Sequence, residues 1–192
     1  KISIIGSTGS IGTQTLEVVA ANPNKLKIVA LAANSNDRLM EEQIEAFNPV
    51  VAALSDEQAA QRLRSRYNGK TKILSGAEGL QAIATHEDAD TVLAAMVGYA
   101  GLRPTLEAIK SGKNIALANK QTMVAAGSIV MAAVKQHGVA ITPVDSEHCA
   151  IFQALQGNKH REVKRLLITA SGGPFRGRTV EDLANVTLEQ CL

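Results

Sequence analysis

A glycine-rich turn near the start of the chain constrains the fold more than any other stretch. The turn reads GSTGSIG and places Gly6, Gly9 and Gly12 at three-residue intervals. It follows an apolar run suited to a buried strand, residues 2–5, and precedes a pattern typical of a helix, residues 11–21. Glycines at such a turn let the backbone approach a pyrophosphate, which then lies at the N-terminus of the helix. The turn therefore predicts a βαβ unit that binds a dinucleotide, rather than a glycine-rich turn without a ligand.

Strand and helix patterns alternate along the next part of the chain. Apolar runs typical of buried strands lie at residues 28–32, 50–54, 73–74, 91–97 and 114–118, and at the start of the stretch 139–155. Helical patterns follow them at residues 37–47, 56–67, 77–84, 102–110 and 122–136, and at the end of the stretch 139–155. Strands that alternate with helices form a parallel sheet covered on both faces. We therefore predict an α/β fold with a Rossmann-like, doubly wound and mainly parallel sheet.

The pattern changes after residue 155. Residues 163–170 suit a strand, the turn SGGPF follows, and a capped helix begins after Thr179. We expect residues 1–145 to form a dinucleotide-binding domain and residues 146–192 to begin an α+β catalytic domain. The second segment is too short to bury a core of its own. Because the chain also starts with Lys1 directly before a strand, we expect it to be a piece of a longer protein.

Composition excludes several classes of partner. A net charge of +2 and an aromatic content of 3%, without Trp, argue against nucleic-acid binding. The sequence contains no apolar run as long as a membrane span and does not open with a signal peptide. Cys149 and Cys191 form neither a metal motif nor a disulfide framework. We therefore expect a cytoplasmic protein whose partner is a small molecule rather than nucleic acid or a membrane.

The end of the second predicted strand bears on which dinucleotide is bound. An NAD site usually carries Asp or Glu at this tip, about 20 residues beyond the glycines. Here the tip carries Asn34, Ser35 and Asn36, and the first acid, Asp37, is expected to cap the next helix. Without a carboxylate the tip does not repel a 2′-phosphate, and its side chains can donate to one. Arg38 either assists or is a solvated helix residue. The sequence therefore predicts NADP(H).

A pair of carboxylates lies within the stretch 139–155. Asp145 and Glu147 are two positions apart at the expected carboxyl end of a strand, so both can face one point. Two hard oxygen ligands suit Mg²⁺ or Mn²⁺, which complete their shells with water and substrate. The alternative is that Asp145 or Ser146 caps the following helix, with Glu147 in its first turn. Taken alone the D-x-E pattern favours the cap, but the dinucleotide turn upstream favours the metal.

Two further turns are expected at the same edge of the sheet. In the first, after the strand pattern 91–97, Gly98 and Gly101 allow the backbone to approach a cofactor. Asn119, Lys120 and Gln121 follow the strand pattern 114–118. Lys120 either contacts a substrate oxygen or phosphate or is an ordinary exposed lysine. In the segment after residue 155, Ser171 and the following glycines of SGGPF either bind an anion such as phosphate or form a plain turn.

Four sequence blocks together resemble the 1-deoxy-D-xylulose 5-phosphate reductoisomerase family. The blocks are GSTGSIG, LANKQ, PVDSEHCAIFQAL and TASGGPFR, and the resemblance spans the chain. It implies an NADPH-dependent oxidoreductase and isomerase of non-mevalonate isoprenoid biosynthesis, which needs Mg²⁺ or Mn²⁺ and is a homodimer at full length. Such an enzyme converts 1-deoxy-D-xylulose 5-phosphate to 2-C-methyl-D-erythritol 4-phosphate by a skeletal rearrangement followed by hydride transfer.

The resemblance also implies roles for individual residues. The residues implied in NADPH binding are Thr8, Gly9, Ser10 and Ile11 at the pyrophosphate, Asn34, Ser35 and Asn36 at the adenosine ribose phosphate, and Asn119 and Gln121 toward the nicotinamide. Asp145 and Glu147 match metal ligands. The substrate contacts implied are Lys120, Ser146, Glu147 and Ser171, of which Glu147 and Lys120 are the catalytic candidates.

Departures and competing interpretations remain at this point. The family commonly has Glu where Gln121 stands and Asn where Cys149 stands. The family's third metal carboxylate, its lid and its C-terminal helical domain would follow Leu192, so we expect this chain to bind NADPH without turning over substrate. Another NADP-dependent dehydrogenase would share the glycine turn but would not need D-x-E beside SGGPF. A dinucleotide sensor without catalytic activity is the third possibility.

Overall fold

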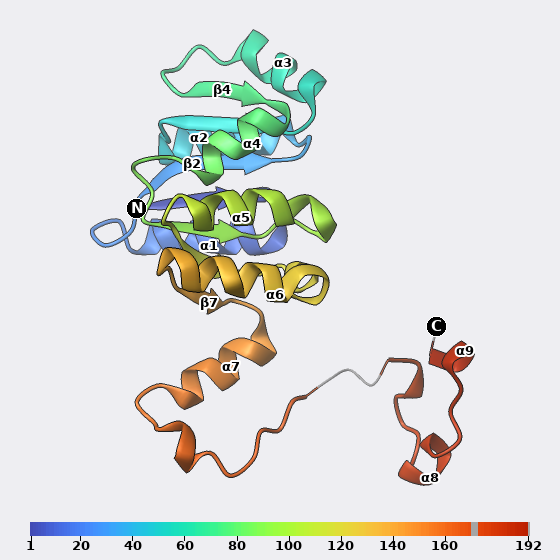
Figure 1. Cartoon of the computed structure of the whole chain (residues 1–192). Coiled ribbons are helices and arrows are strands. Elements are labelled where there is room, and N and C mark those ends of the chain that lie inside the picture. Colours follow the sequence, from blue (N-terminus) through green and yellow to red (C-terminus); the bar gives the residue numbers. More distant parts are fainter. Residues whose placement is uncertain (170–172, 192) are drawn as a thin grey trace. The chain divides into compact units, whose positions relative to one another are not determined.

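The computed structural model describes residues 1–169 and 173–191 (Figure 1). These residues form two compact units, Lys1–Cys149 and Ala150–Leu192. The border predicted after residue 145 remains a prediction of domain organisation. Within the described ranges, no helix has both the length and the apolar character that crossing a membrane would require.

The first unit is built on a seven-stranded sheet in which every neighbouring pair is parallel. The strands are β1 (Ile2–Ile5), β2 (Ile28–Ala33), β3 (Val51–Leu54), β4 (Lys72–Ser75), β5 (Thr91–Ala94), β6 (Asn114–Leu117) and β7 (Ile141–Pro143). Their spatial order is β4-β3-β2-β1-β5-β6-β7. The chain thus builds outward from β1 to β4 and then returns to the other side of β1 with β5. This reversal is the topological switch point of a doubly wound sheet, and the predicted α/β class is confirmed.

Helices cover both faces of the sheet. They are α1 (Ser10–Ala21), α2 (Asp37–Phe47), α3 (Glu57–Arg66), α4 (Gly76–Ala84), α5 (Leu102–Lys110) and α6 (Lys120–His137). One core cluster joins the sheet to α4, α5 and α6, and the other joins it to α1, α2 and α3. Figure 1 shows α4, α5 and α6 together on the face toward the viewer. Ile4 packs in one cluster and Ile5 in the other, because successive side chains of a strand point to opposite faces.

Two element boundaries near the site differ from those predicted. The strand predicted at residues 91–97 ends at Ala94, and a 3₁₀ turn, η1 (Gly98–Gly101), follows it. Gly98 has a positive φ of 68°, which breaks the extended course of the chain. The helix predicted at residues 122–136 already begins at Lys120 and contains a non-helical residue, Ala126. Lys120 therefore lies in the first turn of α6 and not in the preceding loop.

Helix α7 (Ser146–Leu155) follows β7, and the border between the two units falls within it, after Cys149. The second unit also contains the short helices η2 (His160–Glu162), η3 (Gly173–Phe175), α8 (Val180–Leu183) and α9 (Leu188–Cys191). The capped helix predicted after Thr179 is confirmed: the Thr179 hydroxyl accepts from the Asp182 N–H, and the Asp182 carboxylate accepts from the Thr179 N–H.

The strand predicted at residues 163–170 is wrong over residues 163–169, and Ala170 lies outside the described residues. Leu166, Leu167 and Ile168 are exposed there. A strand is stable only when a neighbouring strand takes up its backbone hydrogen bonds. The described residues of this unit contain no strand that could do so. The prediction was wrong because it rested on the apolar composition of these residues alone.

Candidate functional site

The glycine turn connects β1 to α1 in a conformation that only small residues allow. Gly6 has φ +98°, and a Cβ placed on it would lie 2.7 Å from the backbone of Ala95. A Cβ on Gly12 would lie 2.2 Å from the Gly6 carbonyl oxygen. The turn therefore packs backbone against backbone, both toward the end of β5 and toward the first turn of α1. Gly9, by contrast, is exposed and has an ordinary extended φ of −81°.

A groove of about 490 Å³ lies beside this turn. Its lining comes from the turn, the ends of β2 and β3, the start of α4 and the segment after β5: Gly6, Thr8, Gly9, Asn34, Ser55, Ala77, Leu80, Ala95, Met96, Val97 and Ala100. The groove is thus at the switch point between β1 and β5, where doubly wound folds bind dinucleotides. The turn after β5 was expected at this edge, but its residues 95–97 were assigned to the strand because their sequence is apolar.

The predicted pyrophosphate residues divide into two pairs. Thr8 and Gly9 line the groove, whereas Ser10 and Ile11 begin the first turn of α1 and do not line it. The Thr8 N–H has no hydrogen-bond acceptor within residues 1–169 and 173–191. The N–H groups at the start of α1 add the partial positive charge of a helix N-terminus. The turn thus presents backbone donors to an anion.

The tip of β2 carries polar side chains and no free carboxylate. Asn34, Ser35 and Asn36 are all exposed, and Asn34 lines the groove. The Asn36 Oδ1 accepts from the Leu39 N–H at 3.2 Å, so Asn36 is the N-cap of α2. The expectation that Asp37 caps this helix is therefore wrong.

Asp37 is instead the centre of a small ion-pair network. Its carboxylate accepts from Arg62 at 3.1 Å and from Arg66 at 2.6 Å, and Arg66 also contacts Glu41. Arg62 first, and then Arg66, hold the pKa of Asp37 down to about 2 by hydrogen bonding to its charged form. The acid nearest to the β2 tip is thus neutralised by two cations. Arg38, which was considered as an aid to phosphate binding, is exposed.

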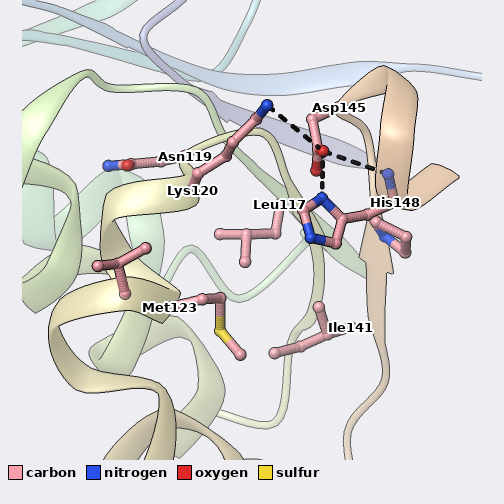
Figure 2. A pocket seen from close by; sticks show the side chains of 9 residues that line it. Leu117, Asn119, Lys120, Met123, Ile141, Asp145 and His148 are labelled. Carbon is pink, nitrogen blue, oxygen red and sulfur yellow. Dashed lines mark hydrogen bonds and ion pairs between the residues drawn. The ribbon is translucent and has the colours of Figure 1, made fainter. Parts of the chain in front are cut away.

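A second cavity, of about 360 Å³, lies beside β6 and β7 (Figure 2). Its residues come from the ends of these strands and the first turns of α6 and α7: Leu117, Asn119, Lys120, Met123, Val124, Ile141, Pro143, Asp145 and His148. Asn119 is 4% exposed, and its Nδ2 donates to the Gly98 carbonyl at 2.8 Å. This side chain therefore ties the loop after β6 to the loop after β5.

Lys120, Asp145 and Glu147 come together at the rim of this second cavity. The Lys120 Nζ lies 3.1 Å from the Glu147 Oε2 and 3.9 Å from the Asp145 Oδ2. The Asp145 Oδ2 also accepts from the His148 N–H at 3.4 Å and contacts the His148 ring at Nδ1. Figure 2 shows the ammonium and the imidazole approaching this carboxylate. Asp145 thus caps α7, as one interpretation of the D-x-E pattern expects, and it also faces the Lys120 ammonium, while the metal interpretation stays a prediction.

The electrostatics keep both carboxylates charged. Burial acts to raise the pKa of Asp145, but hydrogen bonds from His148 and the charge of Lys120 outweigh it, and the net shift is downward. The pKa of Glu147 is lowered by a backbone hydrogen bond and by Lys120. One oxygen of each carboxylate thus approaches the same cation, the Lys120 ammonium. No group of three His, Cys, Asp or Glu side chains capable of holding a metal exists among the described residues.

The remaining predicted site residues do not line the second cavity or lie outside the described residues. Gln121 is exposed in the first turn of α6, and Ser146 is exposed at the start of α7; neither lines the second cavity. Ser171 lies outside the described residues. His148 was not predicted as a site residue, although its spacing of three from Asp145 is the signal for a contact across one helical turn.

The sheet order and the glycine turn at the switch point define the class of Rossmann-like α/β proteins. Within it, a family model for 1-deoxy-D-xylulose 5-phosphate reductoisomerase matches residues 2–127, and a model for the C-terminal domain of that enzyme matches residues 141–192. The chain belongs to the 1-deoxy-D-xylulose 5-phosphate reductoisomerase family. This match favours the family over the other dehydrogenases and the dinucleotide sensor considered from the sequence.

Individual relatives agree with the family match. The chain is 53% identical over 193 residues to 1-deoxy-D-xylulose 5-phosphate reductoisomerase of Geotalea uraniireducens, and 50% identical over 191 residues to that of a Geobacillus species. The alignments cover 100% of this chain and 50% of each relative. The chain therefore spans about half the length of the curated relatives it matches.

Solved structures give the same result. The reductoisomerase from Zymomonas mobilis in complex with NADPH superimposes with a TM-score of 0.85 at 38% identity, over 98% of this chain and 50% of that one. A reductoisomerase in complex with NADPH, fosmidomycin and magnesium superimposes with a TM-score of 0.81 at 40% identity, over 98% of this chain and 49% of that one.

Proposed function

We propose that this chain is the NADPH-binding half of a 1-deoxy-D-xylulose 5-phosphate reductoisomerase. The whole enzyme would convert 1-deoxy-D-xylulose 5-phosphate to 2-C-methyl-D-erythritol 4-phosphate in non-mevalonate isoprenoid biosynthesis. The observation that carries the proposal is the groove of about 490 Å³ at the switch point, bordered by the glycine turn and by a β2 tip without a free carboxylate. Related enzymes were solved in complex with NADPH and with magnesium.

The groove fits a phosphorylated dinucleotide. Gly9 leaves room at the turn, and the unpaired Thr8 N–H offers a donor for the pyrophosphate within the described part of the chain. Ser10 and Ile11 would contribute N–H groups from the first turn of α1. Asn34, Ser35 and Asn36 would donate to the 2′-phosphate, and the neutralised Asp37 would not repel it. Asn119 and Gln121 would lie toward the nicotinamide.

The two carboxylates that follow β7, which we call the acidic end of the sheet, fit part of a divalent-metal site. Asp145 and Glu147 direct oxygens at one cation, the Lys120 ammonium. Mg²⁺ and Mn²⁺ prefer such oxygens and keep several water or substrate ligands, so two carboxylates would form one side of the shell. In the reaction, NADPH would supply a hydride and the divalent ion would polarise substrate oxygens.

The side chains around the second cavity would position the sugar phosphate. Lys120, whose side chain is 53% exposed, would contact a substrate oxygen once it leaves the two carboxylates. Glu147 would accept a proton from a substrate hydroxyl, for which its lowered pKa keeps it ionised. Ser146 and Ser171 would add hydrogen bonds to the substrate. The apolar wall formed by Leu117, Met123 and Ile141 would exclude water from the reacting carbons.

Several properties of the whole enzyme belong to the same proposal. We infer a cytoplasmic homodimer whose partner is a small sugar phosphate and not nucleic acid or a membrane. Residues 1–145 would form the NADPH domain, and residues 146–192 would begin the catalytic domain. This chain alone would bind NADPH and would be inactive, because only two carboxylates of the metal site lie in it.

The proposal is tested in the full-length protein by Asp145→Asn and Glu147→Gln. Each variant should lose activity with Mg²⁺ or Mn²⁺, because each removes charge that offsets the desolvation of the ion. NADPH affinity should stay at the wild-type value, because the glycine turn lies at a different strand end. Glu45→Gln, an exposed change on α2, is the matched control. Full activity in Glu147→Gln would contradict the metal assignment, and loss of NADPH binding in both variants would contradict the separation of the two sites.

A further inference from the structure

A buried glutamine reaches the glycine turn from a neighbouring helix. Gln43 lies on α2 and is 5% exposed. Its Nε2 donates to the backbone carbonyl of Ser7 at 2.9 Å, across 36 positions of sequence. Ser7 is fully buried, and its carbonyl oxygen would lie 2.6 Å from a Cβ placed on Gly12. The carbonyl is therefore enclosed by α1 on one side and held by Gln43 on the other.

This hydrogen bond fixes the orientation of the Ser7–Thr8 peptide, whose N–H belongs to a residue that lines the groove. The Ser7 C=O and the Thr8 N–H belong to one planar trans peptide unit, in which they point in opposite directions. Because Gln43 holds the Ser7 oxygen toward α2, the Thr8 N–H is directed away from α2. Thr8 lines the groove, and its N–H has no acceptor among residues 1–169 and 173–191. The position of one amide hydrogen at the groove thus depends on a side chain that does not line it.

The other anchors of the turn do not replace this contact. The N–H groups of Gly6 and Ser7 both donate to the Ala32 carbonyl, at 2.8 and 2.9 Å, and the Gly9 N–H donates to the Gly6 carbonyl at 3.1 Å. These bonds fix the start of the turn and its closure, but none involves the Ser7 oxygen. Without Gln43 this buried carbonyl would lose the hydrogen bond that holds it, which favours rotation of the Ser7–Thr8 peptide toward a new donor.

We propose that Gln43 is a positioning residue for the pyrophosphate of the dinucleotide: it orients the Ser7–Thr8 peptide so that the Thr8 N–H faces the bound phosphate. The inference rests on the proposed function, because it requires a dinucleotide in the groove. It assigns to α2 a part in phosphate binding in addition to its packing against the sheet.

The test replaces Gln43 with Met, which has a similar length but no donor, in the 192-residue chain. NADPH affinity measured by calorimetry should fall about five- to tenfold, the effect of losing one hydrogen bond of ordinary strength. Adenosine 2′-monophosphate, which carries the 2′-phosphate but no pyrophosphate, should bind the wild type and Gln43→Met equally. Gln136→Met, the same change at an exposed position near the end of α6, should leave both affinities unchanged.

The outcomes separate this inference from the proposed function. A wild-type chain that does not bind NADPH overturns both. A wild-type chain that binds NADPH, with Gln43→Met within twofold of it, overturns the role of Gln43 alone. An equal loss of both ligands in Gln43→Met indicates a general loosening of the fold and also overturns it.

A measurement on the wild-type chain keeps the inference testable if Gln43→Met does not fold. Inorganic pyrophosphate is titrated into isotope-labelled chain and followed by the amide resonances. The Thr8 amide should shift most in the turn, and the Gln43 side-chain amide should shift with it at the same midpoint. An unshifted Thr8 amide at saturation would overturn the proposal.

Discussion

The groove at the switch point and the second cavity are built in different ways. The groove at the switch point surrounds a glycine turn whose Gly6 and Ser7 N–H groups donate to Ala32 in β2 and whose backbone packs closely against Ala95. The acidic end near β7 is made of side chains at the last strand of the sheet, and Lys120 and His148 are exposed there. The backbone of the glycine turn is therefore held in place by the fold itself. The arrangement of the Asp145 and Glu147 side chains depends instead on which cation they face.

The ion pairs of the two regions differ in their ratio of charges. Asp37 accepts hydrogen bonds from two arginines, so two cations surround one carboxylate. Asp145 and Glu147 share a single lysine, Lys120, so one cation serves two carboxylates. The Asp37 carboxylate is therefore fully offset, whereas the two carboxylates near Lys120 can accept a further cation.

Replacing Gly12 with Ala should have the largest effect. The new Cβ would lie 2.2 Å from the Gly6 oxygen, so the turn and the start of α1 must move apart. We expect a loss of about 3 kcal/mol of unfolding free energy and a loss of NADPH binding. Urea denaturation and calorimetry measure the two effects. Gly127→Ala, whose Cβ would only touch Met123 at 3.8 Å, is the matched control and should not destabilise the chain.

Replacing Gly9 with Val should separate binding from folding. Gly9 has an extended backbone, and its added Cβ would meet the Gly6 oxygen at 3.4 Å, an ordinary contact. The side chain would therefore project into the groove without disturbing the sheet. NADPH binding should fall below detection in calorimetry while the denaturation midpoint stays near that of the wild type. A folded variant with wild-type affinity would place the cofactor elsewhere.

Replacing Ser35 with Asp should reduce the preference for NADPH over NADH. The new carboxylate stands at the β2 tip and is not neutralised as Asp37 is. Repulsion of the 2′-phosphate should lower the ratio of the two affinities about tenfold. Fluorescence titration with each nucleotide measures this ratio. Ser128→Asp, which adds the same charge at an exposed position of α6, controls for net charge.

Replacing Asp37 with Asn should have the smallest effect, about 1 kcal/mol at neutral pH. Because folding lowers the pKa of Asp37 from 3.8 to about 2, its contribution is present above about pH 4 and is lost as the pH falls toward 2. The difference in stability between the wild type and Asp37→Asn should therefore be constant near neutrality and shrink below about pH 4. Denaturation at a series of pH values measures it. Asp56→Asn, which keeps an oxygen for the Ala59 N–H, is the matched control.

Most of the sheet could be predicted from the sequence because its strands are short, apolar and separated by helical periods. β2 reads IVALAA and is buried at every position, as expected for a central parallel strand. The end of β5 could not be predicted, because Ala95 and Met96 are as apolar as the strand but line the groove. Residues 163–169 were assigned to a strand on composition, which does not tell whether a neighbouring strand exists.

The candidate site was predictable where the backbone defines it. The spacing of the glycines indicates the turn directly, and the positions of Lys120, Asp145 and Glu147 after strands predicted that they would share one edge of the sheet, although not that they would form ion pairs. The contact from Gln43 to Ser7 could not be predicted, because it joins two elements far apart in the sequence. The capping role of Asn36 in place of Asp37 was equally hidden, because the Asp37 carboxylate binds two arginines on α3 that lie 25 and 29 positions away in the sequence.

The most direct measurement is a fluorescence titration of NADPH into the 192-residue chain, followed by addition of 1-deoxy-D-xylulose 5-phosphate with Mg²⁺ or Mn²⁺. The nicotinamide signal reports both binding and oxidation. If the groove beside the glycine turn is complete in this chain and Asp145 and Glu147 form only part of a metal site, NADPH should bind saturably and its signal should persist after the sugar phosphate is added. Failure to bind NADPH would contradict the assignment of the groove, and loss of the signal through turnover would contradict the assignment of this chain as the cofactor-binding half.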